Sequence, residues 1–230
     1  MLVRWTERAH GDVRTPPGLG GLDPGPGVRG APRQLCQVHG ADVAVLDPDP
    51  GIDRVLPTGA FRVDPRAPGA RPPEGDALVT AVPGVALAVV VADCAPVALG
   101  SPEGICGAVH AGWRGIVAGV LENAVAVLRA LGATEVVAGL GPCAGPCCYE
   151  FGSEGIAAMV RRWGPTVAGR TRGGRPALDL PAAVGAVLGD LDVALVTAAG
   201  VCTVCSPRHF SYRGGDAAAR QAMVVWRPAP

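Results

Sequence analysis

The sequence contains no lysine, little histidine and few aromatic residues. All 20 basic residues are arginine and are matched by 20 acidic residues, so the formal net charge is zero at pH 7. Without an excess of positive charge, bulk electrostatics gives the chain no attraction to nucleic acid or to an anionic membrane surface, and we expect neither partner. Glycine, proline, alanine and arginine are abundant, as is typical of GC-rich coding, so the number of arginines does not by itself indicate anion sites.

Long hydrophobic runs are also missing, and we expect no leader peptide. No apolar run is long enough to span a bilayer, and the first residues lack the cationic and then apolar pattern of a signal peptide. We therefore expect a cytoplasmic protein whose cysteines are reduced. The 230 residues, 49% of them hydrophobic, predict one domain over residues 1–230 with a large core.

The most informative stretch is residues 85–121. Residues 85–91 are apolar without alternation, as in a strand covered on both faces, and the run is followed by Asp93 and Cys94. Residues 105–109 repeat the pattern and are followed by His110. If these two strands are neighbours, a thiol and an imidazole lie at one edge of a sheet. A helix with apolar residues at helical spacing is predicted from residue 116 to 128.

The remaining regular structure is predicted in shorter segments. Strands are predicted at 3–6, 35–46 with a turn at His39–Gly40, 75–80, 135–140, 193–196 and 221–226, and helices at 153–163 and 179–188. Ser153 and Asp179 are the predicted N-caps of these helices. Residues 47–74 are rich in Pro, Gly, Asp and Arg, and they predict an inserted surface loop.

His39, Cys94 and His110 are the first candidates for chemistry. Two imidazoles and a thiolate form a three-ligand zinc set whose fourth position stays open to water or substrate. An ion with an open position can lower the pKa of bound water to about 7, as a catalytic zinc does. A buried cysteine beside two hydrogen-bonded histidines remains the alternative interpretation, because the three residues are far apart in the sequence.

The same atoms also allow a cysteine nucleophile. In that interpretation Cys94 attacks, His110 is the base, and Asp76 or Asp93 orients the imidazole. A zinc ligand and a nucleophile compete for one thiol, so the two hypotheses exclude each other.

The other thiols include one CxxC motif, Cys202 to Cys205. Such a motif can be a redox pair or half of a zinc site. Cys143, Cys147 or Cys148 could supply the other half, but no CxxC occurs among them. We favour plain buried or loop thiols at these positions.

Two arginines are candidates for binding an anion. Arg114 lies at a predicted helix start, where backbone N–H groups favour negative charge, and Arg213 follows Phe210 and Tyr212. The alternative for each is a solvated surface charge.

Six segments together resemble the YfiH/YlmD family, also called the laccase-domain or polyphenol oxidase family. They occur in family order and span most of residues 35–226: CQVHGADV (36–43), GDALVT (75–80), VADCAPVAL (91–99), GAVHAGWRGIVAGVL (107–121), GLGPCAGPCCYEFG (139–152) and VCTVCSPRHFSYRGG (201–215). The resemblance implies an α+β fold, with mixed β-sheets and flanking helices in a layered α/β sandwich. It also implies zinc held by two histidines and a cysteine, here His39, Cys94 and His110.

Members of this family are described as purine nucleoside phosphorylases that act on adenosine, inosine, guanosine and methylthioadenosine and that also deaminate adenosine. Deamination suits attack by zinc-activated water, with Asp76 or Asp93 relaying protons. Phosphorolysis needs a held phosphate, for which Arg114 and Arg213 are our candidates. The older label of multicopper laccase does not suit four histidines, because several copper ions need more ligands.

The chain departs from the family pattern in two places. Residues 6–33 are shorter than the usual first segment, so substrate contacts from that segment are not expected. The Pro/Gly-rich insertion at 47–74 lengthens the loop beside the candidate site.

From the resemblance and the His39, Cys94 and His110 set, we expect a zinc-dependent purine nucleoside phosphorylase that also deaminates adenosine. A cysteine hydrolase or peptidoglycan-editing protein using Cys94 and His110, or a nucleoside-binding protein with little turnover, is the alternative.

Overall fold

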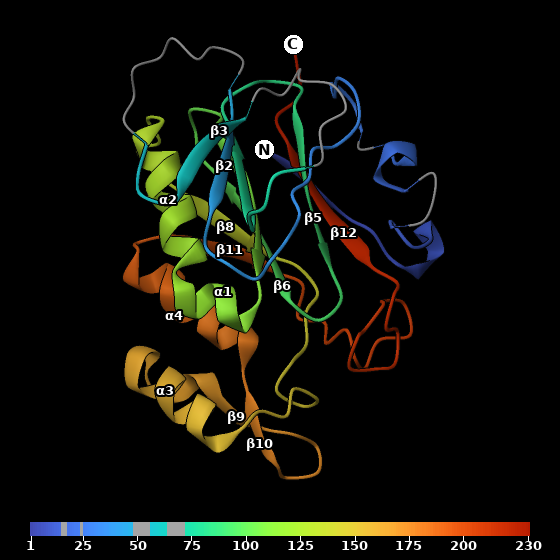
Figure 1. Cartoon of the computed structure of the whole chain (residues 1–230), viewed down its shortest axis with the longest axis vertical. Helices are drawn as coiled ribbons and strands as arrows, with labels where there is room; N and C mark the ends of the chain where they lie inside the picture. The colour runs from blue at the N-terminus through green and yellow to red at the C-terminus, as the bar shows by residue number, and fades with distance from the viewer. Residues whose placement is uncertain (15–17, 24, 48–55, 64–71) are drawn as a thin grey trace.

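A seven-stranded mixed sheet forms the middle layer of the molecule, with helices on one face and a three-stranded sheet on the other (Figure 1). The computed structural model describes residues 1–14, 18–23, 25–47, 56–63 and 72–230. The strands of the large sheet, in spatial order, are β11 (Ala194–Ala198), β8 (Val137–Leu140), β6 (Ala95–Gly100), β7 (Cys106–Ala111), β4 (Ala77–Thr80), β2 (Val43–Leu46) and β3 (Ala60–Val63). The three-stranded sheet has the order β1 (Leu2–Trp5), β12 (Gln221–Trp226) and β5 (Ala86–Val91).

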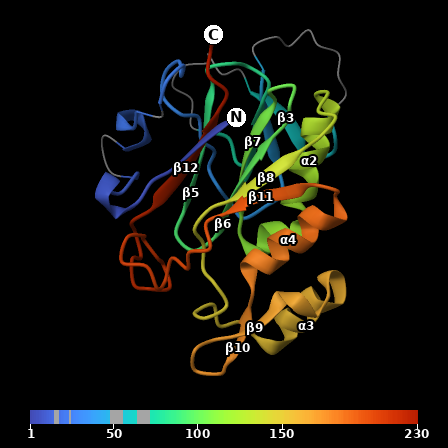
Figure 2. The same ribbon diagram turned by 180° about the vertical axis from the view of Figure 1, so that it is seen from behind.

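Both parallel and antiparallel pairs occur in the large sheet. β4, β7, β6 and β8 pair antiparallel in its centre, while β2 runs parallel to β3 and to β4, and β11 runs parallel to β8. Figure 2 shows β11 at the end of the sheet beside α4. The predicted α+β class with mixed sheets is therefore confirmed.

Helices cover one face of this sheet. They are α1 (Trp113–Ala118), α2 (Val120–Ala130), α3 (Ser153–Trp163) and α4 (Leu180–Asp190), and a two-stranded ribbon of β9 (Ala168–Arg170) and β10 (Pro176–Leu178) lies beside α3. The main core lies between sheet and helices, with Ile116, Leu121, Leu128 and Leu188 fully buried. Among the described residues, no helix is long and apolar enough to span a bilayer.

Two strands of the three-stranded sheet, β5 and β12, are buried on both faces. Leu87 and Val89 of β5 pack with Leu78 and Ala108 of the large sheet, whereas Ala86 and Ala88 face the N-terminal segment that carries Val13 and Leu19. This explains the run of apolar residues without alternation, because a strand between two layers needs apolar side chains on both sides.

The two apolar runs are not neighbouring strands, although Cys94 and His110 do lie close together. β5 belongs to the three-stranded sheet and does not pair with β7. After Ala92–Cys94 the chain passes to the large sheet as β6, a strand that the sequence analysis missed, and β6 is the antiparallel neighbour of β7. The passage between the layers therefore brings Cys94 to the end of β7 that carries His110.

Three further predictions need correction. Residues 60–63 of the predicted 47–74 loop form strand β3, while residues 48–55 and 64–71 of that segment lie outside the described residues. The predicted 116–128 helix is two helices, because Gly119 adopts a left-handed conformation (φ 95°) that ends α1 and begins α2. Gly152, not Ser153, is the N-cap of α3, and it makes no side-chain capping bond.

Candidate functional site

His110 and Asp76 form the buried floor of the candidate site. His110 is the fifth residue of β7, and Asp76 directly precedes the neighbouring strand β4. His110 Nδ1 lies 2.7 Å from Asp76 Oδ1, and the backbone N–H of His110 donates to the carbonyl oxygen of Asp76 over 2.8 Å. Because Nδ1 is held by the carboxylate, Nε2 is the ring nitrogen that remains available to a ligand.

His39 lies on a turn that the same carboxylate fixes. The backbone N–H groups of Val38, His39 and Gly40 donate to the Asp76 oxygens over 3.2, 3.0 and 2.7 Å. His39 has a φ of 61°, a left-handed conformation that residues other than glycine rarely adopt and that is enriched at functional sites. The chain bends at His39–Gly40, where the predicted 35–46 strand was expected to be interrupted, but only residues 43–46 of that segment form a strand, β2. Asp76 therefore positions both histidines.

Cys94 completes the group from the segment between β5 and β6. Its Sγ lies 3.7 Å from His39 Nε2, and the two imidazole rings meet edge to face with centroids 4.8 Å apart. One ligand atom from each of His39, Cys94 and His110 lies within 4.8 Å of the others. His39 is exposed, Cys94 is half-buried and His110 is buried, so the group opens to solvent on the His39 side.

The group has the electrostatics of a thiolate–imidazolium pair. Burial opposes ionisation of the Cys94 thiol, but hydrogen bonds and charge from His110 and His39 outweigh it and lower the pKa of Cys94 to about 6. Burial likewise opposes protonation of His110, and the partners Asp76 and Cys94 outweigh it and raise the pKa of His110 to about 9. Without a metal the pair is therefore ionised at neutral pH, and its two protons titrate as a coupled unit.

The geometry of the donors fits a zinc ion. For tetrahedral zinc with Zn–S of about 2.3 Å and Zn–N of about 2.0 Å, a sulfur and a nitrogen ligand lie about 3.6 Å apart. The observed 3.7 Å between Cys94 Sγ and His39 Nε2 agrees with that separation. A thiolate, two imidazoles and a carboxylate hydrogen-bonded to one imidazole also form the donor set and the supporting contact typical of zinc.

Gly112 leaves the space that this group needs. A Cβ atom at Gly112 would lie 2.9 Å from His39 Cδ2 and 3.1 Å from Cys94 Sγ. The φ of Gly112 is −71°, so any residue could adopt its backbone conformation and the requirement is one of volume. A glycine before α1 is therefore part of the site, although the sequence analysis did not single it out.

Asp93 is adjacent to Cys94 but makes its contacts elsewhere. Its Oδ1 accepts from Thr203 Oγ1 over 2.6 Å and its Oδ2 accepts from the backbone N–H of Arg213 over 2.8 Å. Asp93 is buried and has a φ of 87°. It therefore links Cys94 to two C-terminal loops, and this link is what the structure adds to the sequence prediction.

The two predicted arginines flank a row of aromatic rings. Arg114 packs on the ring of Trp113 at 4.5 Å, and Arg213 packs on the ring of Tyr149 at 4.3 Å. The ring of Phe151 lies between the other two rings, with centroid distances of 5.2 Å to Trp113 and 6.0 Å to Tyr149. Both arginines are exposed. Sequence reasoning missed this row, although the low aromatic content of 4% makes three clustered rings conspicuous.

The row lies beside the thiol of the candidate site. Burial and the negative charge of Cys94 raise the pKa of Tyr149 to about 12, and Arg213 opposes the shift. Gly112, against Cys94, directly precedes Trp113. The row is therefore linked to Cys94 at both ends, through Tyr149 electrostatically and through Gly112, the residue before Trp113.

Comparison with known proteins identifies relatives of this chain. Residues 28–228 match the family model described as multi-copper polyphenol oxidoreductase laccase. A protein of Streptomyces coelicolor named purine nucleoside phosphorylase is 43% identical over 195 residues, which are 84% of this chain and 73% of the relative.

Two solved structures share the fold. A protein of Neisseria meningitidis has a TM-score of 0.68 at 30% identity, over 85% of this chain and 74% of that one. YlmD from Geobacillus stearothermophilus has a TM-score of 0.64 at 28% identity, over 85% and 73% of the two chains. The chain therefore belongs to the YfiH/YlmD family, whose model carries the laccase description.

Proposed function

We propose that this protein is a zinc-dependent purine nucleoside phosphorylase that acts on adenosine, inosine, guanosine and methylthioadenosine and that also deaminates adenosine. The observation that carries the proposal is the meeting of His39, Cys94 and His110 within 4.8 Å at an opening to solvent. The name of the Streptomyces coelicolor relative, at 43% identity, supports the same reaction class.

His39 Nε2, Cys94 Sγ and His110 Nε2 would hold the ion. When bound, zinc supplies a Lewis acid and lowers the pKa of water at its open position to about 7. Asp76 acts through His110, because its hydrogen bond to Nδ1 fixes the tautomer that leaves Nε2 unprotonated. The laccase description is not proposed as an activity, since four histidines cannot ligate several copper ions.

The aromatic row and its arginines support the choice of substrate. Trp113 and Phe151 are half-buried and offer ring surface on which a purine can stack. Arg114 and Arg213 present guanidinium groups beside that surface, as binding of a phosphate dianion requires. In phosphorolysis a phosphate oxygen forms the bond to C1′ of the ribose, and the bond from C1′ to the base nitrogen breaks with its electron pair leaving on the purine.

The test is incubation of the pure protein with adenosine, with and without phosphate, under zinc-replete and chelated conditions. We expect adenine and ribose 1-phosphate only when phosphate is present, and inosine in its presence or absence. Chelation should abolish both phosphorolysis and deamination. Nucleoside binding with no product under zinc-replete conditions would leave a binding protein and overturn the proposal.

One observation favours a second candidate, a cysteine hydrolase. Cys94, His110 and Asp76 are in contact in the order nucleophile, base and orienting carboxylate, and the pKa of Cys94 is lowered to about 6. In this alternative the thiolate attacks a carbonyl carbon, for example in a cell-wall peptide precursor. Activity that persists in metal-free protein and is lost on thiol alkylation would favour the hydrolase over the zinc enzyme.

A further inference from the structure

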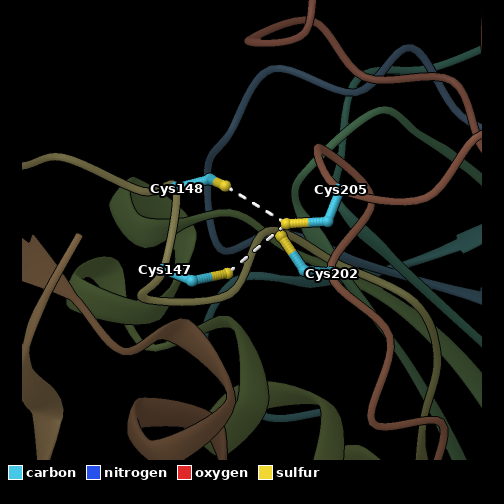
Figure 3. A group of neighbouring side chains, drawn as sticks. All are labelled: Cys147, Cys148, Cys202 and Cys205. Atoms are coloured by element: carbon cyan, nitrogen blue, oxygen red, sulfur yellow. Dashed lines mark hydrogen bonds between the residues drawn. The ribbon is translucent and has the colours of Figure 1, made fainter. Parts of the chain in front are cut away.

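Four cysteines outside the candidate site gather where two loops meet (Figure 3). Cys147 and Cys148 belong to the turn that follows β8, and Cys202 and Cys205 belong to the turn that follows β11. Figure 3 shows the four sulfur atoms directed toward one another from the two sides.

The spacing of the sulfurs suits one tetrahedral ion. Cys205 Sγ lies 3.3 Å from Cys148 Sγ and 3.6 Å from Cys147 Sγ, and all four sulfurs lie within 4.8 Å of one another. Four thiolates around zinc, each at about 2.3 Å, are about 3.8 Å apart. The separations of 3.3 and 3.6 Å are slightly shorter than that value, and the 4.8 Å limit on the other pairs includes it.

Backbone contacts hold the two turns in place. The N–H of Gly145 donates to Cys202 Sγ over 3.3 Å, a contact of the kind that stabilises a metal-bound thiolate. Cys143 and Cys202 form a parallel bridge, and the N–H of Thr203 donates to the carbonyl oxygen of Cys143 over 3.0 Å. The thiols therefore meet on a framework that does not depend on their own bonding.

We propose that Cys147, Cys148, Cys202 and Cys205 bind one Zn²⁺ as a closed, structural site distinct from the one at His39, Cys94 and His110. Four sulfur donors in tetrahedral reach select zinc, and they leave no open position for chemistry. Binding converts four Cys S–H groups to thiolates and releases their protons, with no change in oxidation state. Cys205 is exposed and the other three are half-buried, so an ion can enter from solvent.

Such a site would brace the candidate active site. Thr203 lies inside the Cys202–Cys205 turn and donates to Asp93, the neighbour of Cys94. Cys148 directly precedes Tyr149, on whose ring Arg213 packs. The ion would join the two loops that carry these contacts.

The test is the zinc content of the pure full-length chain, by mass spectrometry, together with zinc X-ray absorption. The Cys148→Ser and Cys205→Ser variants should each lose one zinc per chain, whereas Cys36→Ser, outside both groups, should lose none. In a Cys94→Ser background, where the other site is removed, the remaining zinc should show four sulfur neighbours at about 2.3 Å. This background keeps the test independent of the proposed nucleoside chemistry.

Three outcomes would overturn the proposal. Unchanged zinc content in both Cys148→Ser and Cys205→Ser is one, and stoichiometric iron in place of zinc is another. The third is a disulfide that joins the two turns in the native protein. Thiol titration would then find two fewer free thiols, and peptide mass spectrometry would detect the linked peptides. Circular dichroism of the serine variants identifies unfolding, and if both unfold, X-ray absorption of the folded Cys94→Ser protein decides alone.

Discussion

The two sulfur-containing groups of this protein differ in what surrounds the thiol. Cys94 lies between two imidazoles, which lower its pKa to about 6 despite burial. Burial and sulfur neighbours instead raise the pKa of Cys147 to about 12 and that of Cys148 to about 11. Burial also opposes ionisation of Cys202, but backbone N–H groups of Gly145 and Cys205 lower its pKa. Imidazole neighbours thus favour a thiolate at Cys94 before any ion arrives, whereas ionisation of all four thiols together needs a cation.

The largest expected contrast is in turnover. Cys94→Ser should lower kcat/KM for phosphorolysis roughly 10³-fold, because serine is a poor zinc ligand and the stabilisation supplied by the ion is lost. Cys205→Ser should cost at most about 10-fold, since the loops beside the site loosen but its ligands remain. Steady-state assays of ribose 1-phosphate formation measure both values. Equal losses would remove the functional distinction between the groups.

The thiols should also differ in reactivity once zinc is removed. At pH 7 iodoacetamide should label Cys94 about 10²-fold faster than Cys147 or Cys148, because only Cys94 is largely thiolate at that pH. The pKa of Cys94 is depressed, so its labelling rate should rise as pH increases through about 6 and then level off. Peptide mass spectrometry over a pH series measures the rates. A Cys94 rate that rises only near pH 9 would contradict the ion pair.

Asp76 should matter through the histidines that it positions. Asp76→Asn should weaken zinc binding at this site about 10- to 100-fold, the usual cost of removing the partner of a metal-bound imidazole. In metal-free protein it should also lower the pKa of His110 from about 9, which NMR titration detects. Asp179→Asn, a substitution at the N-cap of α4, is the matched control and should change neither the zinc affinity nor the pKa of His110. Unchanged affinity with a normal fold would exclude the positioning role.

The smallest effect is expected from one methyl group. Gly112→Ala places a Cβ atom 2.9 Å from His39 and 3.1 Å from Cys94, and it should weaken zinc binding there several-fold. Gly152→Ala is the matched control, because Gly152 is also a helix N-cap with negative φ and its Cβ would meet nothing within 4 Å. Competition with a chelator measures the zinc affinity of both variants. Equal affinities would show that the neighbouring side chains move aside freely.

Local chemistry in the sequence predicted some elements well. Asp179 caps α4 by accepting from the N–H of Ala182, as a carboxylate before a proline-containing first turn indicates. Strand β12 has the predicted bounds 221–226, and α3 ends at the predicted residue, Trp163. These patterns depend on neighbours in the sequence, which is why they could be predicted.

The allocation of strands to layers could not be predicted in the same way. β5 and β6 are both apolar, and nothing between them indicates that the chain changes sheets at Ala92–Cys94. The three-ligand group was still found, because His and Cys directly after apolar runs are unusual and the family resemblance placed them together.

The group of four thiols was considered but not favoured, because its two halves are more than 50 residues apart and Cys147 and Cys148 are adjacent, unlike a second CxxC. The aromatic row was missed for the same reason. Trp113, Phe151 and Tyr149 come together only when α1 packs beside the loop after β8.

The passage of the chain from one sheet to the other at Cys94 has a consequence for the order of events during folding. Cys94 directly precedes β6, so its thiol reaches His110 when β6 pairs with β7 in the seven-stranded sheet, and residues 39, 94 and 110 are distant in sequence. Contacts between residues distant in sequence close long loops, which makes them slow to form. Capture of an ion by this group during refolding therefore requires the pairing of β6 with β7, and its time course reports when that part of the seven-stranded sheet assembles.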